Sequence, residues 1–158
     1  AFAYSQFGDY LTGMGTTMVA AIMRRNGSGY VLNVGDSRAY FLHRRVLRQI
    51  SKDHSLVEEL LDAGIITPDQ AVHHPQKNVI TRALGSESLV EADIFPVSLT
   101  PGDSLLLCSD GLSNIVPEEE ITAVLVDSAD AESACRDLLD LALSRGAPDN
   151  VSMIVWKR

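Results

Sequence analysis

The stretch YVLNVGDSRAYFLH, residues 30–43, consists of two apolar runs separated by Gly-Asp-Ser. Each run is short and contains β-branched or aromatic residues, which is typical of β-strands. Met18–Met23 forms a similar run across the turn residues Asn26-Gly27, and Val46–Ile50 forms another across Arg44-Arg45. Because tight turns join all these runs, the sequence predicts four strands arranged as an antiparallel meander.

Helix signals dominate the region that follows. Ser55, with Glu58 three residues later, forms a capping-box pattern and predicts a helix beginning after Ser55. Thr67-Pro68 predicts a short second helix, because proline is favoured in the first helical turn. Pro117, followed by three glutamates, predicts a third helix. The segment Ala131–Ser144 predicts a fourth, because its apolar residues recur at helical spacing.

Further extended segments complete the pattern. They are Ala92–Val97, Ser104–Ser109 and Val151–Trp156. The chain has 158 residues, no internal repeat and no linker rich in Pro, Gly and Ser. The order of strands and helices therefore predicts one α+β domain over residues 1–158, with helices packed on an antiparallel sheet.

Composition and charge exclude several classes of protein. Hydrophobic residues make up 46% of the chain, and no apolar run approaches the length of a membrane-spanning helix. The net charge is −8, and no basic block offsets it, since Arg24-Arg25 and Arg44-Arg45 are only pairs. We therefore expect no binding to nucleic acid and no contact with an anionic membrane. Cys108 and Cys135 lie in apolar segments and fit a reducing cytoplasm, where we expect the protein to reside.

Three aspartates occupy similar positions at the ends of predicted strands. Asp36 and Asp110 each follow a strand, and Asp149 precedes the last strand beside Asn150. Carboxylates that converge at one edge repel one another unless a cation lies between them, and Mg²⁺ and Mn²⁺ prefer oxygen ligands. The alternative is that each aspartate only caps a turn. The spacing by itself leaves both interpretations open.

Six short motifs resemble those of one family in order and approximate spacing. They are Gly13–Thr17 (GMGTT), Val34–Tyr40 (VGDSRAY), Lys52–Ser55 (KDHS), Thr81–Gly85 (TRALG), Leu107–Leu112 (LCSDGL) and Pro148–Ser152 (PDNVS). Each motif alone is weak, but the six together resemble the protein phosphatase 2C family of metal-dependent serine/threonine phosphatases. The resemblance is to the compact bacterial members.

This resemblance implies a β-sandwich flanked by helices, with a Mn²⁺ or Mg²⁺ centre of two or three ions. The implied reaction is hydrolysis of phosphoserine or phosphothreonine in proteins by a metal-activated water. By motif match, Asp110 and Asp149 are ligands of the metal pair, and Asp36 joins Asp110 at a third ion. Asn150 and Gly111 are expected to hold these ligands in position without binding the metal themselves.

The remaining motif residues are expected to serve the structure. His54 should be a hydrogen-bonded structural histidine, and Arg38 and Arg82 should form ion pairs or packing contacts. His73-His74 falls in the region that forms a mobile flap in the family. We therefore expect Gln70–Gln76 to move at the rim of the site.

The family's N-terminal motifs have no match in this chain. No residue matches the arginine that binds the phosphate or the aspartate that bridges the two metals in the family, so no catalytic residue is assigned. The chain also begins at Ala1 without an initiator methionine, and processing of a Met-Ala start is one explanation of this. We expect the N-terminal part of the fold to be missing, so that the chain alone is inactive and its open strand edges favour self-association. The alternative is a truncated phosphatase-like module that binds a partner or a metal without catalysis.

Overall fold

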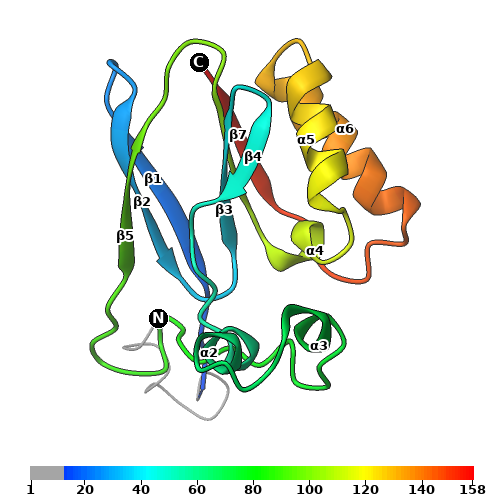
Figure 1. The fold of residues 1–158 in the computed structure, drawn as a ribbon. Coiled ribbons are helices and arrows are strands. Elements are labelled where there is room, and N and C mark those ends of the chain that lie inside the picture. Colours follow the sequence, from blue (N-terminus) through cyan, green and yellow to red (C-terminus); the bar gives the residue numbers. More distant parts are fainter. Residues whose placement is uncertain (1–12) are drawn as a thin grey trace.

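The computed structural model describes residues 13–158, which form two antiparallel sheets packed face to face (Figure 1). The three-stranded sheet has the order β1-β2-β5, and the four-stranded sheet has the order β4-β3-β6-β7. The strands are β1 (Met18–Met23), β2 (Ser28–Val34), β3 (Arg38–His43), β4 (Val46–Gln49), β5 (Asp93–Ser98), β6 (Ser104–Cys108) and β7 (Met153–Lys157). The helices are α2 (Leu56–Asp62), α3 (Pro68–Val72), α4 (Asp110–Ser113), α5 (Glu118–Asp127) and α6 (Ala131–Ser144). The predicted α+β sandwich flanked by helices is confirmed.

The predicted four-stranded meander is wrong. β1 pairs with β2 and β3 pairs with β4, but these two hairpins belong to different sheets. The link Gly35–Ser37 carries the chain from one sheet to the other. Gly35 has a φ of 105°, and a Cβ at this position would lie 2.4 Å from Thr17 Cγ2, so only glycine fits the crossing.

The central strands β3 and β6 are buried on both faces, which explains their nearly continuous apolar sequence. Tyr40 and Leu106 are paired across these strands and face the helices, where they pack with buried side chains of α5 and α6. Leu105 and Leu107 point the other way and pack against Val31 of the three-stranded sheet. Two apolar layers therefore meet in the four-stranded sheet.

The helix starts follow the caps that the sequence predicts. Ser55 accepts a hydrogen bond from the Glu58 amide at the start of α2, and Thr67 and Gln70 form a reciprocal capping box at the start of α3. The short helix α4, which begins at Asp110, was not predicted. No helix of residues 13–158 is long and apolar enough to cross a membrane.

The outer face of the three-stranded sheet carries exposed apolar side chains. Ile22 and Tyr30 are cross-strand neighbours, and Ile94 lies on the same face of β5. Their exposed fractions are 65%, 50% and 61%. None of the helices α2–α6 lies against this face (Figure 1).

Candidate metal-binding rim

The register of β3 and β6 brings two of the predicted metal ligands to one edge of the four-stranded sheet. Arg38 and Cys108 form the last pair of the β3–β6 ladder at this edge, and Asp36 and Asp110 each lie two residues beyond that pair. Asp36 lies in the link between the sheets, and Asp110 is the first residue of α4. We call the edge formed by Asp36, Asp110 and Asp149 the rim.

The electrostatics show that Asp36 and Asp110 interact. Burial is the main cause that raises the pKa of the Asp36 carboxyl above its ordinary value, and the negative charge of Asp110 raises this pKa further. Asn114, one turn along α4, donates a hydrogen bond from Nδ2 to Asp110 Oδ2 over 3.3 Å. A cation between the two carboxylates would remove their repulsion, so this pair fits a Mg²⁺ or Mn²⁺ ion.

Asp149 lies at the same edge, in the loop before β7. Its Oδ1 accepts a hydrogen bond from the backbone amide of Asn150 over 2.7 Å, and the side chain is otherwise exposed. Ser109 joins this loop to β6, because its Oγ donates to the Asn150 carbonyl oxygen (3.1 Å) and accepts from the Ser152 amide (3.0 Å). Within the described chain, the contacts of Asn150 with Asp149 and Ser109 are therefore made by its backbone amide and carbonyl oxygen.

Gly111 allows the loop before β7 to approach α4. A Cβ at Gly111 would lie 2.3 Å from the carbonyl oxygen of Asn150, which is far inside van der Waals contact. Any side chain at Gly111 would therefore push the Asp149 loop away from Asp110.

The rim is an incomplete metal site within residues 13–158. No group of three or more His, Cys, Asp and Glu side chains in this part of the chain is arranged to hold a metal ion. Asp36 and Asp110 interact electrostatically, but no third carboxylate of the described residues completes a group with them. These residues fit one ion held mostly by water rather than a closed binuclear centre.

His54 supports the Gly35 crossing, in agreement with the structural role predicted for it. The Gly35 amide donates to His54 Nδ1 (3.0 Å), and the His54 amide donates to the Gly35 carbonyl oxygen (2.9 Å). The other ring nitrogen, Nε2, lies 3.4 Å from Asp93 Oδ2 and 3.1 Å from Arg82 Nη1. His54 thus holds in place the backbone that carries Asp36.

Arg38 and Arg82 form ion pairs, also as predicted. Arg38 holds Asp53 through two guanidinium nitrogens, with Nη2 2.8 Å from Asp53 Oδ2. Arg82 Nη1 lies 2.9 Å from Asp93 Oδ1. Asp53 and Asn114 were not singled out from the sequence. Asp53 directly precedes His54 in its motif, and Asn114 is four residues after Asp110 on a helix, so both signals were present.

A polar cavity lies beside the rim, between α2, α3 and α4. Its volume is about 290 Å³, and the Arg38–Asp53 pair, Lys77 and Asn114 are part of its wall. Ser113 also lines it, and its buried hydroxyl has no hydrogen-bond partner among the described residues. The mobility of the neighbouring segment Gln70–Gln76 stays a prediction.

A sequence model of the family described as Protein phosphatase 2C matches residues 4–148. The chain belongs to the protein phosphatase 2C family. It is similar to the serine/threonine phosphatase stp of Listeria monocytogenes, with 46% identity over 98% of this chain and 61% of the relative. It is also similar to the serine/threonine protein phosphatase PstP of Mycobacterium tuberculosis, with 46% identity over 92% of this chain and 28% of the relative.

Solved structures of this family have the same fold. The crystal structure of the serine/threonine phosphatase Stp1 from Staphylococcus aureus is 42% identical, with a TM-score of 0.91 over 98% of this chain and 60% of that protein. The catalytic domain of PstP, in complex with two manganese ions, is 40% identical, with a TM-score of 0.83 over 98% of this chain and 64% of that domain. The chain thus spans about 60% of the length of the Listeria and Staphylococcus phosphatases.

Proposed function

We propose that the chain is part of the catalytic domain of a metal-dependent protein serine/threonine phosphatase. The observation that carries this proposal is the pair of interacting carboxylates, Asp36 and Asp110, at the end of the four-stranded sheet in a phosphatase 2C fold. The substrates of this reaction class are phosphoserine and phosphothreonine residues of proteins. We place the protein in the cytoplasm, in keeping with the free thiols of Cys108 and Cys135.

The proposed roles follow from the positions of the rim residues. Asp110 and Asp149 would hold the Mn²⁺ or Mg²⁺ ions nearest the reaction, and Asp36 with Asp110 would hold a further ion, so that the complete domain takes two or three. When bound, such ions activate water and offset charge on the phosphoryl group. Gly111 and Asn150 keep the Asp149 loop close to α4, and His54 fixes the crossing that carries Asp36.

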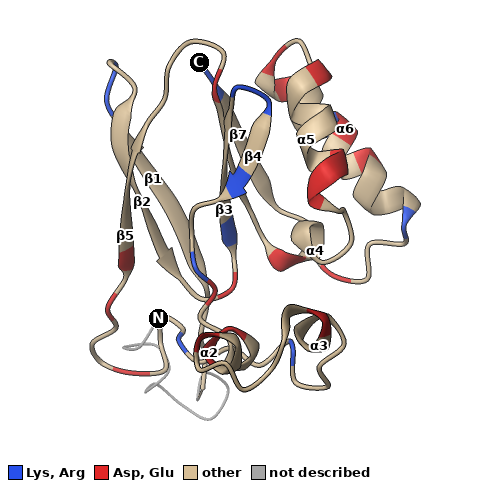
Figure 2. Ribbon diagram, viewed as in Figure 1, with Lys and Arg blue, Asp and Glu red and all other residues tan. Residues whose placement is uncertain are grey.

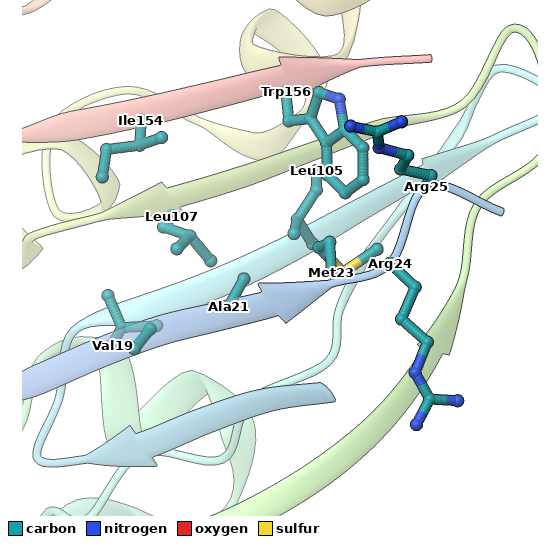
Figure 3. A pocket seen from close by; sticks show the side chains of 10 residues that line it. Val19, Ala21, Met23, Arg24, Arg25, Leu105, Leu107, Ile154 and Trp156 are labelled. Carbon is teal, nitrogen blue, oxygen red and sulfur yellow. The ribbon is translucent and has the colours of Figure 1, made fainter. Parts of the chain in front are cut away.

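An open groove supports the proposal that further chain completes the domain. The groove lies between β1 and β7, has a volume of about 600 Å³, and is lined by apolar side chains that include Val19, Leu107, Ile154 and Trp156 (Figure 3). β1 and β7 are also the last strands of their sheets on this side, so their outer backbone groups lack a neighbouring strand among residues 13–158. A strand that pairs with either edge would cover the groove.

We propose that the missing part is the N-terminal portion of the family's domain, so that this chain is its C-terminal part. The span of about 60% of the relatives' length is consistent with this, as are the groove and the exposed outer face of β1-β2-β5. Without that portion, a second copy of the chain is the available partner for the open edges, which would produce self-association.

The comparison of two aspartates tests the proposed function. In the natural gene product that contains this chain, Asp110→Asn should lower kcat/KM for a phosphothreonine peptide with Mn²⁺ by several orders of magnitude. Asp36→Asn should lower it far less, because it would remove a ligand of the outer ion only. Equal losses would contradict the assignment.

A second candidate function is a phosphatase-like module that binds a partner or a metal without catalysis. The observation that favours it is the incomplete ligand group within residues 13–158. The mass of the natural gene product separates the two candidates. A product of the relatives' length supports the enzyme, whereas a product of this chain's length supports the binding module.

A further inference from the structure

Six of the chain's 13 lysines and arginines gather at the end of the sandwich opposite the rim (Figure 2). They are Arg24, Arg25, Arg44, Arg45, Lys157 and Arg158. The contacts of Arg158 join separate loops, because its Nη1 donates to the carbonyl oxygens of Asn26, in the β1–β2 turn, and of Leu99. None of the six forms an ion pair with a carboxylate of residues 13–158, whereas five of the other lysines and arginines do.

A hollow lies among these cations, where the β3–β4 turn meets the end of α5 and the end of β7. Its volume is about 510 Å³, and Arg45, Lys157 and Arg158 line it. The buried side chains of Leu42 and Leu125 contribute an apolar floor, and no Asp or Glu of the described chain lines it. Lys157 Nζ is held by carbonyl oxygens at the end of α5, so its charge is fixed in place without a neutralising carboxylate.

The β3–β4 turn places arginine where the backbone disfavours it. Arg44 and Arg45 are the two central residues of a two-residue hairpin turn, with φ of 49° and 65°. Such turns favour Asn-Gly, because L side chains are strained at positive φ. The neighbouring turns at this end use Gly27 and Gly102 at positive φ. Both arginine side chains are exposed, and neither forms a side-chain hydrogen bond or an ion pair with residues 13–158, so the fold gives no reason for arginine here.

We propose that the cationic hollow is a docking site for a short acidic segment of another polypeptide. Its carboxylates would pair with Arg44 and Arg45, and its apolar atoms would pack on Val126, which also lines the hollow and is half-buried. The strained turn then has a reason, because it presents two positive charges next to the hollow. This proposal does not depend on the phosphatase reaction, since the hollow lies at the other end of the strands from the rim.

The surroundings favour a short peptide over an extended anionic surface. Asp127, Asp130 and Glu132 are exposed on the helix ends that border the hollow, and the whole chain carries a net charge of −8. These charges repel a bilayer or a nucleic acid, which must approach along a broad front. A short segment reaches the arginines without passing over the acidic helix ends.

The test uses fluorescence anisotropy with a fluorescein-labelled octapeptide that alternates Glu and Leu. The 158-residue chain should bind this peptide at low salt and release it as salt is added. The double substitution Arg44→Asn/Arg45→Gly should weaken binding about tenfold. The same change should raise the melting temperature by about 3 °C, because it relieves the strained turn. Opposite effects on binding and stability distinguish a docking role from a structural role.

A matched control removes the same charge elsewhere. Lys52→Gln/Lys77→Gln changes two exposed lysines near the rim and should leave the affinity for the peptide within about twofold. Unchanged peptide binding in the arginine variant, or a fall in its melting temperature, would overturn the proposal. Phosphatidylserine vesicles or single-stranded DNA that bind as tightly as the peptide, with the same loss in the arginine variant, would overturn the choice of an acidic polypeptide.

Discussion

The four-stranded sheet packs against α5 and α6 on its outer face and against the other sheet on its inner face. The three-stranded sheet has only the inner contact within residues 13–158, and its outer face exposes Ile22, Tyr30 and Ile94. Strands with similar apolar sequences thus lie in different environments. The comparison shows that an apolar strand pattern identifies a face that must be buried. It does not identify the element that packs on that face, which can belong to another part of the polypeptide or to a partner.

The largest expected effect is a difference in stability between the two sheets. Leu106→Ala removes a side chain that is 0% exposed between the sheet and the helices, and it should lower the free energy of unfolding by about 3–4 kcal/mol. Ile94→Ala on the open face, where the side chain is 61% exposed, should cost less than about 0.5 kcal/mol. Urea unfolding followed by circular dichroism measures both. Equal costs would mean that the outer face of β5 is covered in solution.

Of the ion pairs at the starts of β3 and β5, the one in the four-stranded sheet should again contribute more to the free energy of unfolding. Asp53→Asn leaves the Arg38 guanidinium partly buried without its carboxylate and should cost about 2 kcal/mol of unfolding free energy. Asp93→Asn breaks the more exposed contact with Arg82 and should cost less than about 1 kcal/mol. The same urea titration tests this order. A larger cost for Asp93→Asn would show that the contacts of Asp93 with Arg82 and His54 contribute more to stability than the Arg38–Asp53 pair does.

A smaller effect concerns the turn that joins the two sheets between β5 and β6. Burial alone would raise the pKa of Asp103, but hydrogen bonds from Thr100 and from His43 outweigh it and lower this pKa below its ordinary value. A carboxyl with a lowered pKa in the folded state stabilises the protein above its unfolded pKa of about 4, and this contribution is lost as the pH falls through the folded value.

We therefore expect the melting temperature of the wild-type chain to fall more steeply on acidification below about pH 5 than that of Asp103→Asn. Differential scanning calorimetry across this pH range makes the comparison. Parallel curves for the two proteins would show that Asp103 does not contribute to the acid sensitivity.

The local elements of the fold could be predicted because their signals are local. The cap at Ser55 and the periodicity of residues 131–144 are contained within a few turns of helix, and the structure places both helices there. The division of the strands between two sheets could not be predicted, because it depends on the pairing of β3 with β6, whose sequences are more than 60 residues apart. In the sequence, the link Gly35–Ser37 has the same residue types as a tight turn within one sheet.

The candidate site was also predicted in part. Asp36, Asp110 and Asp149 could be selected because each lies next to an apolar strand, but only the pairing of β3 with β6 shows that Asp36 and Asp110 come together. Asn114 and Asp53 act through partners that are remote or that depend on the helix α4, which the sequence did not predict.

Metal binding and turnover by the 158-residue chain test the central claim most directly. Isothermal titration with Mn²⁺ should show one weakly bound ion that is lost in Asp110→Asn. A phosphothreonine peptide should not be hydrolysed above the rate without protein, because Asp36 and Asp110 alone do not hold two ions close together. Robust Mn²⁺-dependent hydrolysis by this chain, abolished by Asp110→Ala, would contradict the account and show that a second copy or another group completes the site.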